Sequence, residues 1–199
     1  MAGSKGWRVK TARPDDLVHP DEFYTEEEAE RYDKRSVIRK TQRELTLRAL
    51  ELADFPAGAK ILDIGCGTGI SMQTLAENGF EAQGIDISKP MLAVAKRKGL
   101  KVKFGDIKKM PGKGEFDGII SISVIQWLKN KDEMKAAAKE CLRILSEGGK
   151  AVFQFYPASE EHMVQAAKAF ADAGFKEVKL AIDSPENSRK RKIFLIACK

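Results

Sequence analysis

The chain has 199 residues, which is enough for one domain with a hydrophobic core and too few for two domains of ordinary size. Its 35 Lys and Arg exceed its 29 Asp and Glu and give a net charge of +6, an excess that permits contact with nucleic acid without requiring it. No apolar stretch reaches the length of a membrane span, and 3 scattered cysteines indicate neither a disulfide framework nor a zinc site, so we expect a cytoplasmic protein with free thiols and no metal.

Residues 1–22 are rich in Lys, Arg, Pro and Gly and show no hydrophobic periodicity, so an irregular basic arm is predicted there. Its bases could contact the phosphates of a nucleic acid, although a solvated tail is the alternative interpretation. The candidate residues are Lys5, Arg8, Lys10 and Arg13.

Two helices are expected after the arm, over 25–33 and 35–54. The first begins with a threonine N-cap followed three residues later by glutamate, and the second carries leucines that suggest a face packed on the sheet. Because both helices precede the first strand, the segment 23–57 is expected to fold over the sheet as a lid that carries Tyr24 and Tyr32.

The remaining residues, 58–199, alternate strands and helices as a sheet core does, and with the lid they form one predicted domain, 23–199. Strands are expected at 61–64, 81–86, 101–104, 116–122, 150–156, 175–182 and 192–198. Helices are expected at 68–78, 88–99, 132–145 and 159–173. No helix separates the last two strands, so these two should pair antiparallel.

The first strand ends in an acid and three alternating glycines, over 63–69. A strand, a glycine turn and a helix form a nucleotide-shaped pocket at the carboxyl end of a sheet, and two cofactors are compatible with the spacing. A dinucleotide needs a pyrophosphate at this turn, and Asp63 would repel it. S-adenosylmethionine carries an ammonium and a sulfonium instead, which a carboxylate favours.

Two further acids end the next two strands. Asp86 is placed to accept hydrogen bonds from ribose hydroxyls, and Asp106 to meet the adenine amino group, with the Ile107 N–H beside a ring nitrogen. Helix capping is the alternative role for such acids, but three in one register are harder to explain in that way. A nicotinamide-dependent oxidoreductase would leave Asp63 and Asp106 without a role.

The DxGxGxG pattern at 63–69 resembles that of class I S-adenosylmethionine-dependent methyltransferases. The string Ser121-Ile122-Ser123-Val124-Ile125-Gln126-Trp127-Leu128 is similar to the corresponding string of the small-subunit rRNA guanine-N7 methyltransferases that act in ribosome assembly. Further similar segments lie at 20–30, 84–92, 154–157 and 187–190. Eukaryotic members carry a basic C-terminal extension that this chain lacks, as expected of an archaeal-type member.

This resemblance implies an α/β fold, a Rossmann-like, mostly parallel sheet of seven strands in the order 3-2-1-4-5-7-6 with helices on both faces. It also implies methyl transfer from S-adenosylmethionine to N7 of a guanine in small-subunit rRNA, within the pre-ribosome. The partner it implies is a small zinc-ribbon activator subunit that adds a strand to the sheet edge at 101–104.

The resemblance also assigns residues to the site. Cofactor-binding residues would be Tyr32, Asp63, Gly65, Cys66, Gly67, Gly69, Asp86, Ile87, Met91, Asp106, Ile107 and Ser121, with the core as the alternative place for Met91. Ser121 and Gln126 would lie beside the methionine and the methyl acceptor. Trp127 and Tyr156 would stack on an extruded guanine, a contact worth ~1–3 kcal/mol per base. An aromatic anchor between helix and sheet is the alternative for Trp127.

The substrate side leaves alternatives open. No Asn-Pro-Pro-Tyr-like motif follows the fourth strand, and guanine N7 needs no proton removed, so alignment and a dry pocket would suffice. The same absence fits a methyltransferase of a quinone-like or sterol-like small molecule, or an assembly factor whose binding matters more than its catalysis. The basic run Arg189-Lys190-Arg191-Lys192 follows the sixth strand on the cofactor side and is a candidate RNA contact, with a solvated turn as the alternative.

Overall fold

The computed structural model describes residues 23–112, 115–128, 130–188 and 190–199. The predicted arm with Lys5, Arg8, Lys10 and Arg13 lies outside these residues, as does Arg189. The elements in chain order are α3 (Glu26–Lys34), α4 (Ser36–Ala53), β1 (Lys60–Ile64), α5 (Ile70–Glu77), β2 (Glu81–Asp86), α6 (Lys89–Arg97), β3 (Val102–Phe104), β4 (Phe116–Ile122), η1 (Ile125–Trp127), α7 (Lys131–Ile144), β5 (Leu145–Phe155), α8 (Glu160–Ala173), β6 (Glu177–Asp183) and β7 (Lys192–Cys198).

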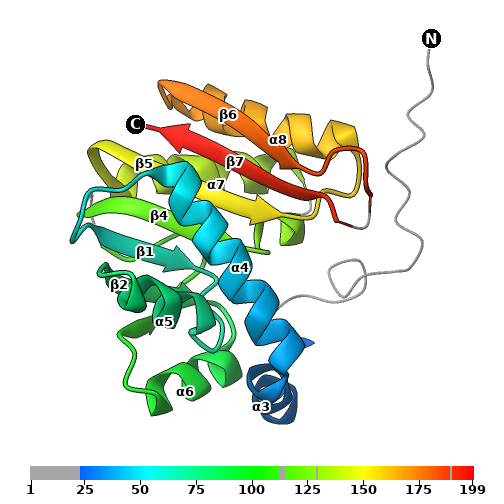
Figure 1. Cartoon of the computed structure of the whole chain (residues 1–199). Coiled ribbons are helices and arrows are strands. Elements are labelled where there is room, and N and C mark those ends of the chain that lie inside the picture. Colours follow the sequence, from blue (N-terminus) through cyan, green and yellow to red (C-terminus); the bar gives the residue numbers. More distant parts are fainter. Residues whose placement is uncertain (1–22, 113–114, 129, 189) are drawn as a thin grey trace.

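The strands form one seven-stranded sheet in the order β3-β2-β1-β4-β5-β7-β6 (Figure 1). The strands β1 to β5 pair in parallel, and β7 runs antiparallel to both of its neighbours. The central strands β1 and β4 are buried along nearly their whole length, as expected for strands covered on both faces. The predicted class I methyltransferase fold is therefore confirmed.

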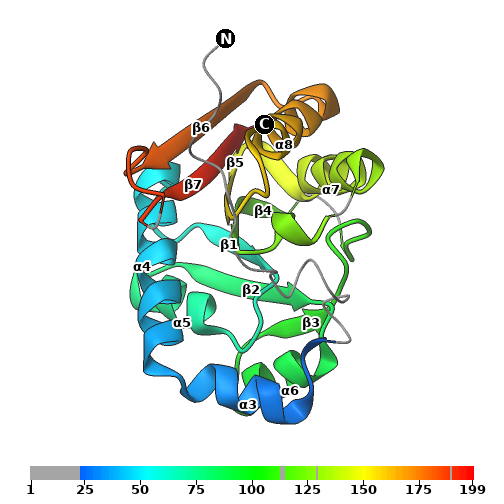
Figure 2. The ribbon, with the colours of Figure 1, turned by 90° about the vertical axis from the view of Figure 1, so that its right-hand side faces the viewer.

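Helices cover both faces of this sheet (Figure 2). On one face, Leu45 and Ala49 of α4 pack with Leu75 of α5 against the central strands. On the other face, Cys141 of α7 and Phe170 of α8 pack against the same strands. Burial of these apolar faces fixes the helices to the sheet and leaves its carboxyl edge for the site.

The boundary between α7 and β5 differs from the prediction, which ended the helix at a pair of glycines and began the strand at 150. The helix ends at Ile144, and the strand begins at Leu145 and runs through Gly148 and Gly149. Leu145 is fully buried and pairs with Phe116, and the register then shifts at a bulge. The glycines therefore belong to an irregular strand, because a buried leucine draws the chain directly into the sheet.

Cys66, Cys141 and Cys198 are all free thiols. Within the described ranges, no helix is both long enough and apolar enough to cross a bilayer.

Candidate functional site

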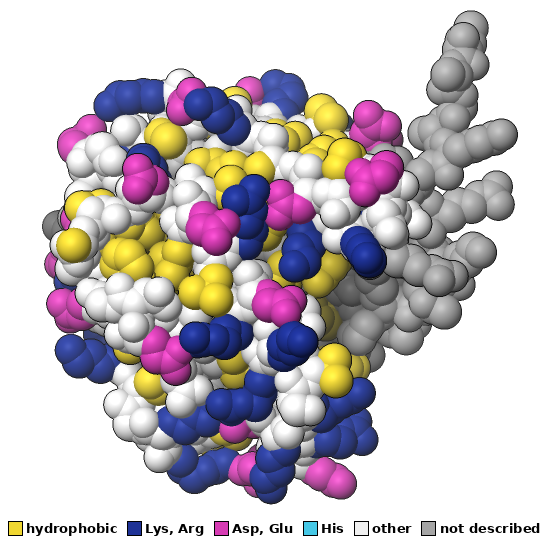
Figure 3. All heavy atoms as spheres, viewed as in Figure 1, with side chains coloured by type: hydrophobic (Ala, Val, Ile, Leu, Met, Phe, Trp, Pro, Cys, Tyr) yellow, Lys and Arg dark blue, Asp and Glu magenta, His cyan; other side chains and the backbone are white. Residues whose placement is uncertain are grey.

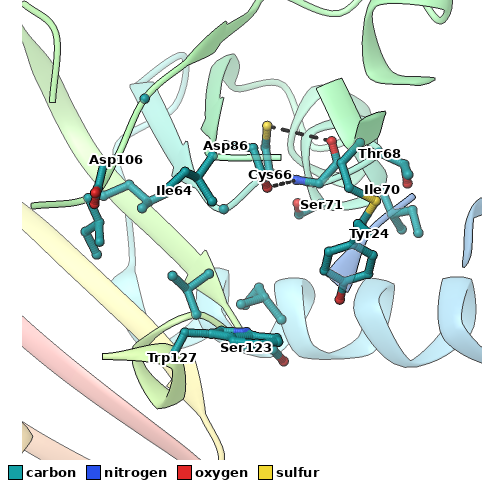
Figure 4. A pocket seen from close by; sticks show the side chains of 18 of the residues that line it. Tyr24, Ile64, Cys66, Thr68, Ile70, Ser71, Asp86, Asp106, Ser123 and Trp127 are labelled. Carbon is teal, nitrogen blue, oxygen red and sulfur yellow. Dashed lines mark hydrogen bonds between the residues drawn. The ribbon is translucent and has the colours of Figure 1, made fainter. Parts of the chain in front are cut away.

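A cavity lies where the carboxyl ends of β1, β2 and β4 meet, and most of the predicted cofactor residues line it. The predicted residues in its lining are Tyr32, Gly65, Cys66, Gly67, Asp86, Ile87, Met91, Asp106, Ile107 and Trp127. In Figure 4, Asp106, Ile64 and Asp86 lie along one side, and Trp127 and Ser123 lie across from them. The parallel sheet thus brings together side chains from four separate segments.

The turn after β1 depends on its glycines. Gly65, Gly67 and Gly69 have φ of 71°, 54° and 84°, in the left-handed region that other residues rarely adopt. A Cβ on Gly65 would lie 2.2 Å from Val124 Cγ2, and one on Gly69 would lie 2.0 Å from Leu100 Cδ1. Gly69 is outside the cavity lining and caps the start of α5, so its cofactor contact stays a prediction.

Asp86 joins the glycine turn to the cavity. One carboxylate oxygen accepts a hydrogen bond from the Gly67 N–H at 2.8 Å, and the other accepts one from the Ser88 N–H at 2.7 Å. Burial raises the pKa of this carboxyl, and the backbone donors limit the increase. A carboxylate can accept about four hydrogen bonds, so Asp86 can hold the turn and still accept one from a ligand.

Asp106 lies at the other end of the same wall. Its carboxylate accepts a hydrogen bond from the Lys108 N–H at 2.9 Å, and Lys108 Nζ lies 3.6 Å from the second oxygen and 3.1 Å from Glu133. Ile107, which follows it, is buried and lines the cavity. The loop after β3 therefore holds its acid in a fixed orientation at the cavity rim.

Asp63 is placed differently from its prediction as a contact residue. It is fully buried, it is not part of the cavity lining, and Ser71 Oγ donates a hydrogen bond to its Oδ2. Strand alternation explains this, because Asp63 shares with Ile61 the face of β1 that α4 and α5 cover. Its Oδ1 has no partner among the described residues. Burial raises the pKa of this carboxyl to about 7, against the Ser71 hydrogen bond and with a contribution from Asp86.

Three of the four predicted catalytic residues do not line the cavity. Ser121 is fully buried and donates a hydrogen bond to the Ile64 carbonyl at 2.9 Å, so it supports the wall, and its direct contact stays a prediction. Gln126 is half-buried, and its Oε1 has no partner among the described residues. Tyr156 lies close enough to Tyr32 to add a small increase to the pKa of that phenol, which burial raises most. Trp127 alone lines the cavity.

The sequence prediction missed Ser123 as a site residue. Ser123 lines the cavity with a φ of 62°, a strained conformation for a residue other than glycine. Gln154 of β5 holds it there, because the Gln154 carbonyl accepts the Ser123 N–H at 2.8 Å and Gln154 Oε1 accepts the Ser123 hydroxyl at 3.0 Å. A glutamine within the apolar run 151–155 of β5 was the available signal.

Aromatic rings close the side of the cavity that faces the N-terminal helices. The ring of Tyr24 lies 4.8 Å from that of Phe23 and 5.9 Å from that of Tyr32, and Phe23 lies 6.3 Å from Trp127. Gln42 of α4, which the sequence prediction also missed, lines the cavity beside them. Burial raises the pKa of Tyr32 above its usual value, so its hydroxyl remains protonated and can donate a hydrogen bond.

The basic run after β6 is only partly available for RNA. Lys190 is exposed, but Arg191 donates to the Pro185 carbonyl at 2.6 Å, and Lys192 Nζ lies 3.9 Å from Glu44 of α4. The predicted set of phosphate contacts is therefore reduced among the described residues to Lys190 and two bases that already have partners.

With this geometry established, comparison with known proteins identifies the family. A family model described as a methyltransferase domain matches residues 62–153. An 18S rRNA (guanine-N(7))-methyltransferase of Arabidopsis thaliana is 39% identical, across 92% of this chain and 68% of that protein. The Schizosaccharomyces pombe enzyme of the same name is 36% identical, across 93% and 74%. The chain belongs to this methyltransferase family.

Solved structures show the same fold. Phosphoethanolamine N-methyltransferase 2 of Haemonchus contortus, in complex with S-adenosyl-L-methionine, has a TM-score of 0.63 at 21% identity, covering 78% of this methyltransferase and 52% of that chain. A Haloferax volcanii chain solved in complex with the Trm112 methyltransferase activator has a TM-score of 0.67 at 18% identity, covering 86% and 97%.

The residues of the cavity fit S-adenosylmethionine. The orphaned Asp63 Oδ1 is a buried acceptor behind the glycine turn, Asp86 and Asp106 are acceptors at the next two strand ends, and the turn carries no base for a pyrophosphate. A cation is therefore favoured here over an anion. The cofactor of this methyltransferase is S-adenosylmethionine.

Proposed function

We propose that this methyltransferase transfers a methyl group to N7 of a guanine in small-subunit rRNA during ribosome assembly. The observation that carries the proposal is a cavity whose strand-end acids face Trp127 and Ser123 across a narrow space lined with aromatic rings. The printed activity of relatives at 36% and 39% identity supports the choice of acceptor. S-adenosylmethionine, when bound, supplies an activated methyl group on its sulfonium.

The residues of the chain then position the cofactor and the acceptor base and exclude water. None of them needs to remove a proton. Asp86 holds the glycine turn and would accept the ribose hydroxyls, Asp106 would accept the adenine amino group, and Asp63 supplies a counter-charge from behind the turn. Trp127 offers its ring to the acceptor base, and Tyr24 with Tyr32 would close the cavity as a lid against water.

The ionisable groups of the lining support an acceptor that needs no base. Burial raises the pKa of the Cys66 thiol well above its usual value and that of the Tyr32 phenol as well, so both stay protonated at neutral pH. The Asp86 carboxylate accepts hydrogen bonds from two backbone N–H groups and would use its remaining capacity on the ribose hydroxyls. Guanine N7 carries its own lone pair, so alignment at a dry site is sufficient.

We also propose an activator subunit on the edge strand β3. This strand pairs with β2 alone among the described strands, and Phe104 on it is 55% exposed. An unpaired edge accepts an added strand through its backbone groups. The Haloferax volcanii neighbour was solved with such an activator, which supports the proposal. The three free thiols suit a reducing cytoplasm, where we place the activity.

The test is transfer of labelled methyl from S-adenosylmethionine into rRNA purified from a strain that lacks the gene, followed by mapping of modified guanines. We expect incorporation at one N7 position with the activator present. Trp127→Ala should reduce transfer about tenfold or more, and Trp127→Phe should retain most of it, because stacking is worth ~1–3 kcal/mol per base.

Two outcomes would overturn the proposal. Transfer to a quinone-like or sterol-like small molecule with none to rRNA would assign the enzyme to the small-molecule class. Normal small-subunit assembly and maturation in a strain carrying Asp86→Lys, a variant that should no longer bind the cofactor, would indicate an assembly factor whose binding matters more than its catalysis.

A further inference from the structure

A dense group of bases lies where α3 meets α4. Six Lys and Arg and a single acid, Asp33, fall within residues 31–43. The bases, which we call the α3–α4 basic surface, are Arg31, Lys34, Arg35, Arg39, Lys40 and Arg43. Figure 3 shows several Lys and Arg side chains around the end of α4 that meets α3, and a mixture of bases and acids further along α4. The RNA contacts predicted from the sequence lie in the N-terminal arm and at 189–192, so they do not account for these bases.

Four of the six bases already have an acidic partner. Arg31 pairs with Glu28, Lys34 Nζ lies 3.6 Å from Glu30, Arg39 lies 3.8 Å from Asp33, and Arg43 pairs with Glu77. Arg35 and Lys40 are both exposed, and neither has an ion-pair partner in the part of the chain that the structure describes. The surface therefore keeps an excess of positive charge that the fold does not neutralise.

This placement is unfavourable for the isolated protein. Arg35 is the N-cap of α4, its side chain makes no capping hydrogen bond, and the first turn contains no acid. Positive charges near a helix N-terminus are repelled by the helix dipole. By contrast, α7 begins with a side-chain cap and with Asp132 and Glu133 in its first turn. An anionic partner would remove the unfavourable charge interaction.

The surface lies beside the entrance to the cofactor cavity. Tyr32 and Gln42 come from the same two helices and line the cavity. Lys192 Nζ, 3.9 Å from Glu44, brings the loop after β6 alongside α4, so exposed Lys190 belongs to the same side of the molecule. An anionic chain that crosses this surface therefore passes the cavity.

We propose that the α3–α4 basic surface binds the phosphate backbone of the RNA whose base enters the cavity, an inference that rests on the proposed function. Arg35, Arg39 and Arg43 recur every four residues along α4, about 6 Å apart, which suits the regular charges of a phosphate chain better than the irregular acids of a protein. Contacts of this kind position the strand without reading its sequence.

The experiment compares two charge-removal variants of the full chain saturated with S-adenosylhomocysteine. One is Arg35→Ala/Lys40→Ala. The matched control is Lys135→Ala/Lys139→Ala, two exposed bases one helical turn apart on α7, on the opposite face of the sheet. Binding of a small-subunit rRNA fragment is measured between roughly 50 and 200 mM salt.

We expect weaker RNA binding for the surface variant and a salt dependence shallower by about 1.4 to 2 in log–log slope, with both quantities unchanged in the control. Cofactor affinity should be unchanged in both variants, and the melting temperature of the surface variant should be equal or higher.

The inference would be overturned if the surface variant bound RNA with the same affinity and the same salt slope as the control. It would also be overturned if the surface variant lost binding to an acidic ribosomal protein while its RNA binding stayed intact. Because the assay needs no turnover, RNA binding by a chain that fails to methylate guanine would count against the proposed function alone.

Discussion

Ser71 donates its hydroxyl hydrogen to one carboxylate oxygen of Asp63 and leaves the other oxygen without a partner among the described residues. Ser71 lines the cavity, while Asp63 lies fully buried behind it. Burial raises the pKa of Asp63 to about 7, and the Ser71 hydrogen bond limits the increase. The charge of the cofactor site therefore changes near neutral pH.

This pairing predicts pH-dependent cofactor binding. A positively charged ligand favours ionised Asp63, so affinity for S-adenosylmethionine should rise as pH increases through about 7 and then level off. In the free protein the sign is opposite, because the raised pKa makes the folded state lose stability as pH rises towards the same value. Calorimetric titrations across this pH range measure the affinity for the cofactor, and unfolding of the free protein across the same range measures its stability.

Variants of Asp63 and Ser71 separate the two residues. Asp63→Asn should abolish the pH dependence, and Ser71→Ala should move its midpoint to higher pH because it removes the hydrogen bond that favours the ionised form. Thr74→Val is the control, since it removes another buried hydroxyl of α5, one that donates to the Ile70 carbonyl. A midpoint that is the same in Ser71→Ala as in Thr74→Val would contradict the assignment.

The glycine turn gives a second prediction, with a matched control. Gly65→Ala should lower cofactor affinity by roughly tenfold or more, because its Cβ would lie 2.2 Å from Val124 and displace the cavity wall. Gly58→Ala has a similar φ of 75° and open space around the new Cβ, so it should cost only about 1 kcal/mol of stability. Equal cofactor affinity in the two variants would show that the contact of the new Cβ with Val124 does not affect cofactor binding, and that the positive φ is the only effect of either substitution.

Lys98 carries a third prediction about the N-terminal helices. Its ammonium donates to Asp33 of α3 and to the Thr68 carbonyl at 2.9 Å, so it links the proposed lid to the glycine turn. Burial alone would raise the pKa of Asp33, but the hydrogen bonds of Lys98 and Thr68 and the charges of Lys98 and Arg39 together outweigh it, and the pKa is lowered. Lys98→Met should accelerate cofactor dissociation about tenfold, since hydrogen bonds to charged groups are worth ~1.5–3 kcal/mol.

The neighbouring pair of Arg97 and Glu30 provides the control for Lys98. Both side chains are largely exposed, so Arg97→Met should change the dissociation rate little. Stopped-flow release of S-adenosylhomocysteine measures both variants. Equal rates in both would mean that α3 does not hold the cofactor in place.

The family resemblance implied the strand order, and the local pattern of apolar runs that end in an acid placed Asp86 and Asp106 at strand ends. It could not predict the packing of Asp63 against Ser71, since the face on which a strand residue points depends on which helix covers that face. Ser121 and Ser123 illustrate the same limit. They are two residues apart in one motif, yet a left-handed φ turns the chain at Ser123 and only that residue lines the cavity.

The support of Ser123 by Gln154 gives the last prediction. Gln154→Leu would leave the Ser123 hydroxyl without its acceptor and weaken the hold on a strained residue, at a cost of ~1–3 kcal/mol in free energy of unfolding. Methyl transfer should fall while cofactor affinity is kept, because Ser123 lies beside Trp127, across the cavity from the strand-end acids.

A double-mutant cycle tests whether the two side chains act together. Ser123→Ala/Gln154→Leu removes both polar partners, so it should be more stable than Gln154→Leu alone, with a coupling energy of about 1 kcal/mol in urea unfolding. The backbone bond from the Ser123 N–H to the Gln154 carbonyl survives in every variant, so the turn itself remains formed. If the effects of the two substitutions on the free energy of unfolding were strictly additive, the hydrogen bond between the two side chains would contribute nothing to stability. The strained conformation of Ser123 would then be maintained by that backbone bond and the packing of Val124.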